Sequence, residues 1–171
     1  MKQNIIFHIG PRKCGKSLYV EKELEICYKN NLYIGTLIPC DKYIEPIHNH
    51  QKRRNNSWTL YEISYSMNND FTYINNFLQK GEIESLLIDG LTTWVSLISK
   101  NTYDLYLHAD ILVNNIIYLI EHYNICIRLI DVIPESFKNK HLKDICKQIH
   151  NTLLEKGNYY NLDIKIINWR I

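Results

Sequence analysis

The feature that most constrains the fold of this chain is a glycine-rich octapeptide near its start, Gly10-Pro11-Arg12-Lys13-Cys14-Gly15-Lys16-Ser17. It matches the pattern G-x-x-x-x-G-K-[ST], whose glycines let the backbone curl until several N–H groups point at one phosphate cluster. Lys16 offers a positive charge to the β- and γ-phosphates, and the hydroxyl of Ser17 is a ligand for Mg²⁺. The positive end of the following helix also faces the phosphates. All eight residues are therefore candidates for binding GTP or ATP with Mg²⁺.

The segments on either side of the octapeptide support this prediction. Residues 4–9 are mostly apolar and typical of a short buried strand, and in residues 17–30 apolar side chains recur at helical spacing. Strand, loop and helix in this order are the setting that the pattern requires. The alternative is a glycine turn before an ordinary helix.

Length and composition limit the classes of protein to which the chain can belong. Its 171 residues, 46% of them hydrophobic, suit one domain over residues 1–171 with a full core. A net charge of +2 demands no nucleic-acid partner. The five cysteines are scattered and lack metal-ligand spacing, which favours a reducing compartment. The first residues lead straight into a strand, and no apolar run reaches the roughly 20 residues that span a bilayer. We therefore expect a cytoplasmic protein without a signal peptide or a membrane span.

Apolar strands and amphipathic helices alternate along the rest of the chain. Residues 39–57 interrupt the alternation, because they are polar, rich in His, Arg and Asn, and expected to form a loop. The alternation predicts an α/β fold, a three-layer P-loop NTPase domain of the RecA-like type, with a mostly parallel sheet and helices on both faces. The expected strands are residues 4–9, 32–37, 59–63, 85–88, 125–132 and 164–167, and the expected helices are residues 17–30, 69–79, 109–123 and 135–156.

An acidic residue, Asp89, ends the apolar run of residues 85–88. In this architecture, an acid at the carboxyl end of a buried strand lies beside the phosphate loop and can hold Mg²⁺, usually through water. Ser17 and Asp89 are therefore the candidate metal ligands. The alternative is that Asp89 only caps the next helix.

Two histidines and three cations are concentrated in residues 48–54. A neutral imidazole is a competent nucleophile near pH 7, because its pKa is about 6.5. Arginines match phosphate oxygens with a forked, always charged group. A histidine beside arginines can therefore attack a nucleotide phosphorus and hold the product covalently. On composition alone, a solvated basic loop is the favoured interpretation.

Five stretches, in order, resemble the bifunctional adenosylcobinamide kinase / adenosylcobinamide-phosphate guanylyltransferase family of cobalamin biosynthesis. The resemblance extends to residue 95. The stretches are the octapeptide, Tyr33-Ile34-Gly35-Thr36, Ile47-His48-Asn49-His50-Gln51-Lys52-Arg53-Arg54, Trp58-Thr59-Leu60-Tyr61-Glu62 and Leu87-Ile88-Asp89-Gly90-Leu91-Thr92-Thr93-Trp94-Val95.

The resemblance implies an enzyme that phosphorylates adenosylcobinamide and transfers GMP from GTP to adenosylcobinamide phosphate through a histidine–GMP intermediate. His50 is the implied GMP carrier, with Lys16 and Asp89 as the other catalytic residues and His48 as the fallback nucleophile. A corrinoid is the implied substrate, and a homo-oligomer is the implied assembly. The residues implied to line the nucleotide site are Gly35, Thr36, Leu37, Gln51, Lys52, Arg53, Arg54, Glu62 and Asp89.

The chain also departs from the family pattern. Pro46 stands where the family usually has arginine, and residues 127–134 contain no glycine although they correspond to an Asn-Glu-Val-Gly loop of the family. Asp131 is the candidate replacement for the acidic residue of that loop. Two alternatives therefore stay open. One is a divergent nucleotide-binding protein that serves as a regulatory or structural module, and the other is an unrelated small-molecule kinase of the P-loop class.

Overall fold

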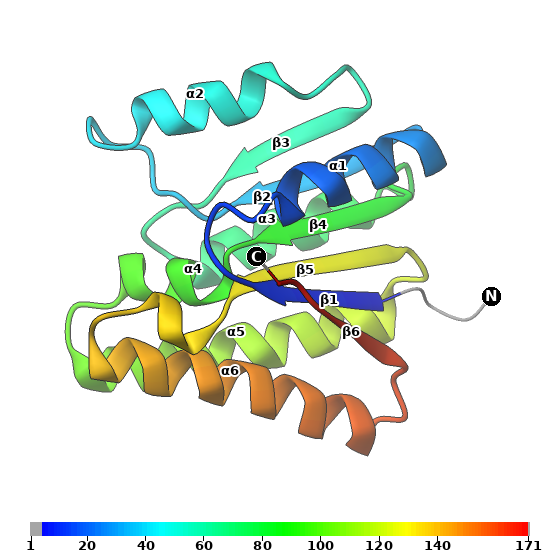
Figure 1. Cartoon of the computed structure of the whole chain (residues 1–171). Helices are drawn as coiled ribbons and strands as arrows, with labels where there is room; N and C mark the ends of the chain where they lie inside the picture. Colours follow the sequence, from blue (N-terminus) through cyan, green and yellow to red (C-terminus); the bar gives the residue numbers. More distant parts are fainter. Residues whose placement is uncertain (1–4, 171) are drawn as a thin grey trace.

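The computed structural model describes residues 5–170 and shows a parallel α/β fold (Figure 1). The described strands form one sheet in the order β3-β2-β4-β5-β1-β6, and every pairing is parallel. The predicted parallel sheet is therefore confirmed, although Asn4, the expected start of the first strand, lies outside the described residues. The strands are β1 Ile5–Gly10, β2 Asn31–Gly35, β3 Trp58–Glu62, β4 Ser85–Asp89, β5 Cys126–Val132 and β6 Ile164–Asn168.

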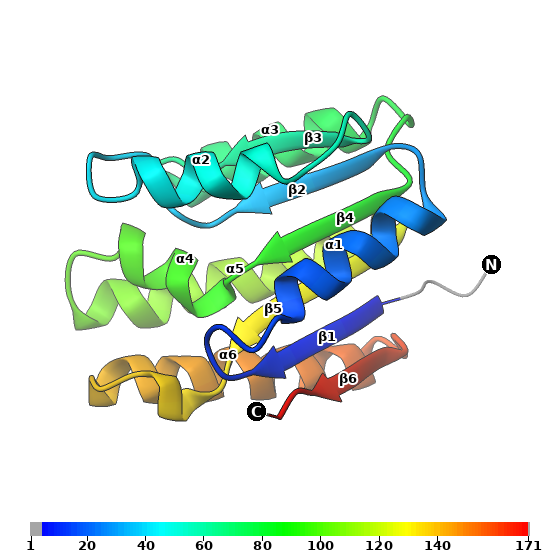
Figure 2. The same ribbon diagram turned by 45° about the horizontal axis from the view of Figure 1, so that its top comes forward.

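Helices cover both faces of the sheet, as the sequence predicted (Figure 2). Helix α1 (Lys16–Cys27) packs on one face through Val20 and Leu24. Helix α2 (Ile44–Lys52) lies on the same side, because Arg53 and Arg54 at its end pair with Glu21 of α1. The opposite face carries the larger core, beneath helices α3 (Met67–Leu78), α4 (Leu91–Ile98), α5 (Thr102–His122) and α6 (Lys140–Tyr159).

The central strands are apolar because both of their faces are covered. In β4, Leu86 and Ile88 contribute to the larger core, whereas Leu87 packs beneath α1. This alternation follows from the two-residue repeat of a strand, and burial of both faces removes the need for polar residues between them. Each such side chain stabilises the fold by about 1.5–3 kcal/mol through its removal from water.

The parallel arrangement brings the carboxyl ends of the strands to one edge of the sheet, where such folds bind ligands. The register places Gly35 of β2 beside both Glu62 of β3 and Asp89 of β4. At the neighbouring strands, Gly10 of β1 pairs with Val132 of β5. The octapeptide leaves the sheet at this edge, so residues from distant parts of the sequence meet beside it.

Strand β1, which carries the octapeptide, lies inside the sheet between β5 and β6. Trp169 follows β6 and packs against the end of β1, where its backbone N–H donates to the Ile9 carbonyl at 2.7 Å. Its indole N–H donates to His8 Nδ1 at 3.2 Å. Burial lowers the pKa of His8 to about 4, so a neutral imidazole is available to accept this bond.

The structure corrects the predicted elements at several places. The expected loop of residues 39–57 contains helix α2, in which Ile47 is buried and Pro46 sits in the first turn, where proline is tolerated. Helix α4 was not predicted at all. Helix α5 begins at Thr102 rather than residue 109, because Asn101 caps it and its first turns are largely exposed. The expected helix from residue 135 is divided: a short 3₁₀ turn, Pro134–Ser136, is followed by the non-helical residues 137–139, and α6 begins at Lys140.

Candidate functional site

The octapeptide forms a tight loop between β1 and α1. Gly15, the residue before the helix, has a φ of 88°, a left-handed conformation that favours glycine. Lys16 begins the helix and is buried, and its Nζ donates to the Pro11 carbonyl at 2.8 Å. The loop thus folds around the lysine ammonium, as expected of a phosphate-binding loop.

A cavity of about 500 Å³ opens beside this loop. Its walls come from the octapeptide, from the carboxyl ends of β2, β3 and β4, and from helix α2. The lining residues that the sequence singled out are Arg12, Lys13, Cys14, Gly15, Lys16, Ser17, Gly35, Thr36, Leu37, Arg53, Glu62 and Asp89. Those that sequence reasoning missed are Leu18, Tyr33, Ile47, Gly90, Thr93 and Val132.

Five other candidates are not among the residues that line the cavity. Gly10 ends strand β1, and Pro11 supplies the carbonyl that Lys16 contacts. The Gln51 side chain hydrogen-bonds to Glu62. Lys52 is exposed, whereas Arg54 is buried beneath the cavity. These residues can support the site without touching its contents.

The two candidate metal ligands are in contact. The side chain of Ser17 hydrogen-bonds to that of Asp89, and this bond partly offsets the rise in the pKa of Asp89 that burial causes. Asp89 is held in place through its backbone, because the Thr36 hydroxyl donates to its carbonyl at 2.6 Å. The oxygen atoms of a hydroxyl and a carboxylate are the ligands that Mg²⁺ prefers, so the pair fits this ion.

The alternative role for Asp89, as the cap of the next helix, is wrong. Gly90 is the N-cap of α4 and gives no side-chain hydrogen bond. The carboxylate that receives the Thr92 N–H in the first turn of α4 belongs to Asp131, at 3.2 Å. Asp89 therefore does not cap α4, and it lines the cavity instead.

Glu62 is the second carboxylate on the wall of the cavity. Burial raises its pKa to about 7, while the Arg54 charge and the Gln51 hydrogen bond oppose that rise. Its carboxylate lies over Gly35, where an added Cβ would stand only 2.0 Å from Glu62 Oε2. Glycine at position 35 is therefore required for the carboxylate to reach this place.

A buried ion-pair cluster joins α1 to the end of α2. Glu21 of α1 accepts hydrogen bonds from Arg53 at 2.8 and 2.5 Å and from Arg54 at 2.7 Å. The Arg54 guanidinium lies 3.4 Å from the centre of the Tyr33 ring, which lines the cavity. Sequence reasoning missed Glu21, although its position four residues after Ser17 places both on one face of α1.

The candidate nucleophiles lie on α2. His50 belongs to this helix, and its side chain lies outside the described part of the structure. His48 is exposed and is not among the residues that line the cavity. Ile47 and Arg53, three residues before and three after His50, do line it. Helix α2 thus forms one wall of the cavity.

No described helix is long and apolar enough to cross a membrane. The fold is similar to that of a KaiC-like protein from the hyperthermophilic archaeon Pyrococcus horikoshii, with a TM-score of 0.52 at 10% sequence identity, over 84% of this chain and 67% of that one. This likeness confirms the RecA-like P-loop fold. Comparison with curated proteins gives no match.

The family comparison covers most of the chain. Residues 6–156 match the family described as cobinamide kinase / cobinamide phosphate guanyltransferase. The match runs past residue 95, where the resemblance of the motifs ended, and includes the helices that cover the larger core. The chain therefore belongs to the cobinamide kinase / cobinamide phosphate guanyltransferase family.

Proposed function

We propose that this protein phosphorylates adenosylcobinamide and then transfers GMP from GTP to adenosylcobinamide phosphate, with His50 as the covalent GMP carrier. Membership of the family supports both reactions. The cavity supports the use of a nucleotide, because it combines the octapeptide with the Ser17–Asp89 pair.

The observation that carries the proposal is the place of helix α2. Ile47 and Arg53 line the cavity that Lys16 and Asp89 also line. Residues three apart on a helix share a face, so the proposal takes the side chain at position 50 to face the same way as that of Ile47. In the proposal, His50 approaches the nucleotide from the α2 side of the cavity, which Lys16 and Asp89 also line.

In the kinase reaction, a hydroxyl oxygen of adenosylcobinamide attacks the γ-phosphorus and releases its proton to solvent, and the bond to the bridging oxygen of the leaving diphosphate breaks. Lys16 and the backbone N–H groups of the octapeptide stabilise the charge on the transferring group. Ser17 and Asp89 would hold Mg²⁺, which supplies charge neutralisation at the phosphates when bound.

In the guanylyl transfer, a ring nitrogen of His50 attacks the α-phosphorus of GTP, and pyrophosphate leaves as the N–P bond forms. A phosphate oxygen of adenosylcobinamide phosphate then attacks the same phosphorus, and the N–P bond breaks to release the histidine. Arg53, which Glu21 holds in place, reduces the negative charge that would repel the attacking groups.

Intact-mass spectrometry after incubation with GTP and Mg²⁺ tests the histidine step. We expect a GMP adduct that is stable in base and labile in acid, absent in His50→Ala and present in the matched control His48→Ala. Loss of the adduct only in His48→Ala would move the nucleophile to residue 48. No adduct on the wild-type chain would contradict the guanylyl transfer.

One observation favours a second candidate function, a nucleotide-binding module without corrinoid chemistry. Asp131, the candidate substitute for the acid of the missing glycine loop, is buried beneath α4 and is not among the residues that line the cavity. A phosphorylation assay with adenosylcobinamide separates the two functions. Nucleotide binding without phosphorylation of the corrinoid would support the module.

A further inference from the structure

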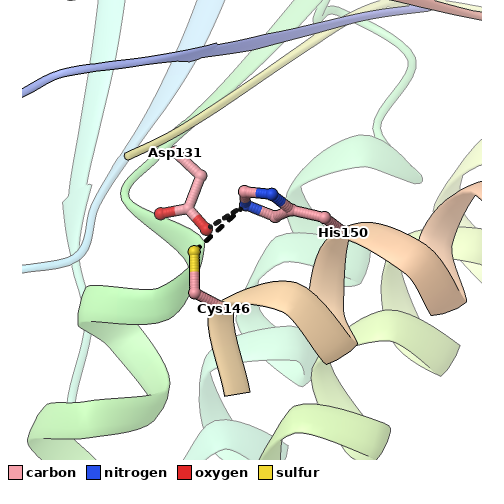
Figure 3. Close-up of side chains that lie close together, drawn as sticks. All are labelled: Asp131, Cys146 and His150. Atoms are coloured by element: carbon pink, nitrogen blue, oxygen red, sulfur yellow. Dashed lines mark hydrogen bonds and ion pairs between the residues drawn. The ribbon is translucent and has the colours of Figure 1, made fainter. Parts of the chain in front are cut away.

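A second group of chemically active side chains lies between the end of β5 and helix α6 (Figure 3). Asp131 comes from β5, and Cys146 and His150 are four residues apart on one face of α6. The His150 Nε2 atom lies 3.0 Å from Asp131 Oδ2 and 3.5 Å from Cys146 Sγ. The three atoms that could bind a metal all lie within 4.8 Å of one another. We call Asp131, Cys146 and His150 the β5–α6 cluster.

The β5–α6 cluster is buried, with 1% of Asp131, 0% of Cys146 and 8% of His150 exposed. A buried carboxylate is costly unless hydrogen bonds or positive charge compensate it. Asp131 receives hydrogen bonds from the Thr92 N–H and hydroxyl, and its ion-pair partner His150 is charged only when protonated. A divalent cation bound by this carboxylate, a thiolate and a neutral imidazole would balance the two negative charges.

The spacing and the chemistry of the three ligands fit zinc. Tetrahedral Zn²⁺ binds nitrogen and oxygen at about 2.0 Å and sulfur at about 2.3 Å. With these bond lengths, a nitrogen and an oxygen ligand lie about 3.3 Å apart, and a nitrogen and a sulfur ligand lie about 3.5 Å apart. The observed separations of 3.0 and 3.5 Å lie close to these values. Sulfur and imidazole ligands select zinc-like ions rather than Mg²⁺. We propose that Asp131, Cys146 and His150 bind one zinc-class transition-metal ion per chain.

The surroundings of the cluster explain what such an ion would do. The Thr92 hydroxyl donates to Asp131 Oδ2 at 2.6 Å, so it would orient this ligand from outside the coordination shell. Thr92 lies in the first turn of α4, next to the cavity-lining Thr93. The Cys146 thiol donates a hydrogen bond to the carbonyl of Val132, which also lines the cavity. The ion would tie β5, α4 and α6 together beneath the nucleotide cavity. The ion would support the fold at this place, and the proposal does not depend on the proposed reactions.

The test uses the full chain without a histidine tag, stripped of metal with a chelator and kept in excess Mg²⁺ so that the Ser17–Asp89 pair does not take up the added ion. Native mass spectrometry during a Zn²⁺ titration should show one zinc per chain. Co²⁺ in place of Zn²⁺ should give the sulfur-to-metal charge-transfer band of a bound thiolate. Cys146→Ser should abolish this band. Thr92→Val removes only an outer-shell contact and should lower the Zn²⁺ affinity by about 10–100-fold. Cys146→Ser should lower the Zn²⁺ affinity by more than Thr92→Val does.

Cys126→Ala is the matched control, because Cys126 is also buried but packs beneath α1 on the other face of the sheet. It should keep both the stoichiometry and the cobalt band. Absence of zinc from the wild-type chain at micromolar Zn²⁺ would overturn the proposal and leave the cluster as a hydrogen-bonded link between β5 and α6. Survival of the cobalt band in Cys146→Ser would overturn it as well. The wild-type titration decides the question even if a variant fails to fold.

Discussion

Replacement of Glu21 by leucine is expected to destabilise the fold strongly, because this carboxylate forms ion pairs with two arginines. The side chains of Glu21 and Arg54 are 2% and 0% exposed, so removal of the acid takes away the carboxylate that pairs directly with this buried guanidinium. Loss of one partner of a buried ion pair costs about 3–5 kcal/mol. The Arg53 side chain is 32% exposed, and its contact adds no more than about 1 kcal/mol.

Urea unfolding of the wild-type and Glu21→Leu chains measures this loss. We expect a fall of about 3–5 kcal/mol in the free energy of unfolding, and a fall of about 6–20 °C in Tm for a chain of this size. The double variant Glu21→Leu/Arg54→Met should recover at least half of the loss, since a buried pair replaced by apolar groups is often neutral. A loss below about 1 kcal/mol, the value of an exposed pair, would refute the reasoning.

Three further predictions concern the cavity. Lys16→Ala should nearly abolish triphosphate binding in titration calorimetry with little change in stability, and unchanged affinity would contradict the nucleotide site. Asp89→Asn should weaken binding more with Mg²⁺ than without it, whereas equal losses would contradict its role as a metal ligand. The pKa of Glu62 is raised to about 7, so this side chain becomes anionic as the pH rises from about 6 to 8. Triphosphate affinity should fall over that interval more steeply in the wild type than in Glu62→Gln, and parallel profiles would contradict the assignment.

Local patterns in the sequence predicted many of the residues that line the cavity. The octapeptide follows strand β1, and Asp89 ends strand β4. Each can therefore be recognised from the residues next to it in the sequence. The parallel sheet followed from the alternation of strands and helices. The carboxyl ends of parallel strands meet at one edge of the sheet, where such folds bind ligands. For this reason, one cavity is lined by the predicted residues Gly35, Glu62 and Asp89.

The parts that sequence reasoning missed depend on partners far away in the chain. Helix α4 has no capping side chain of its own, because the carboxylate at its start comes from Asp131, 39 residues beyond Thr92. Helix α2 is mostly polar, and Glu21 of α1 holds its end. The cysteines showed no metal-ligand spacing, because the proposed partners of Cys146 are a histidine and an aspartate rather than a second cysteine.

The position of β1 in the sheet has a consequence for the order in which the chain can fold during synthesis. The strand that carries the phosphate-binding loop is synthesised before both of its neighbours, β5 and β6, from residues 126–132 and 164–168. Strand pairing over such separations is intrinsically slow, and strands that wait for partners are exposed to aggregation. The phosphate-binding loop therefore reaches its final place in the sheet only after the strands on both sides of β1 have been made.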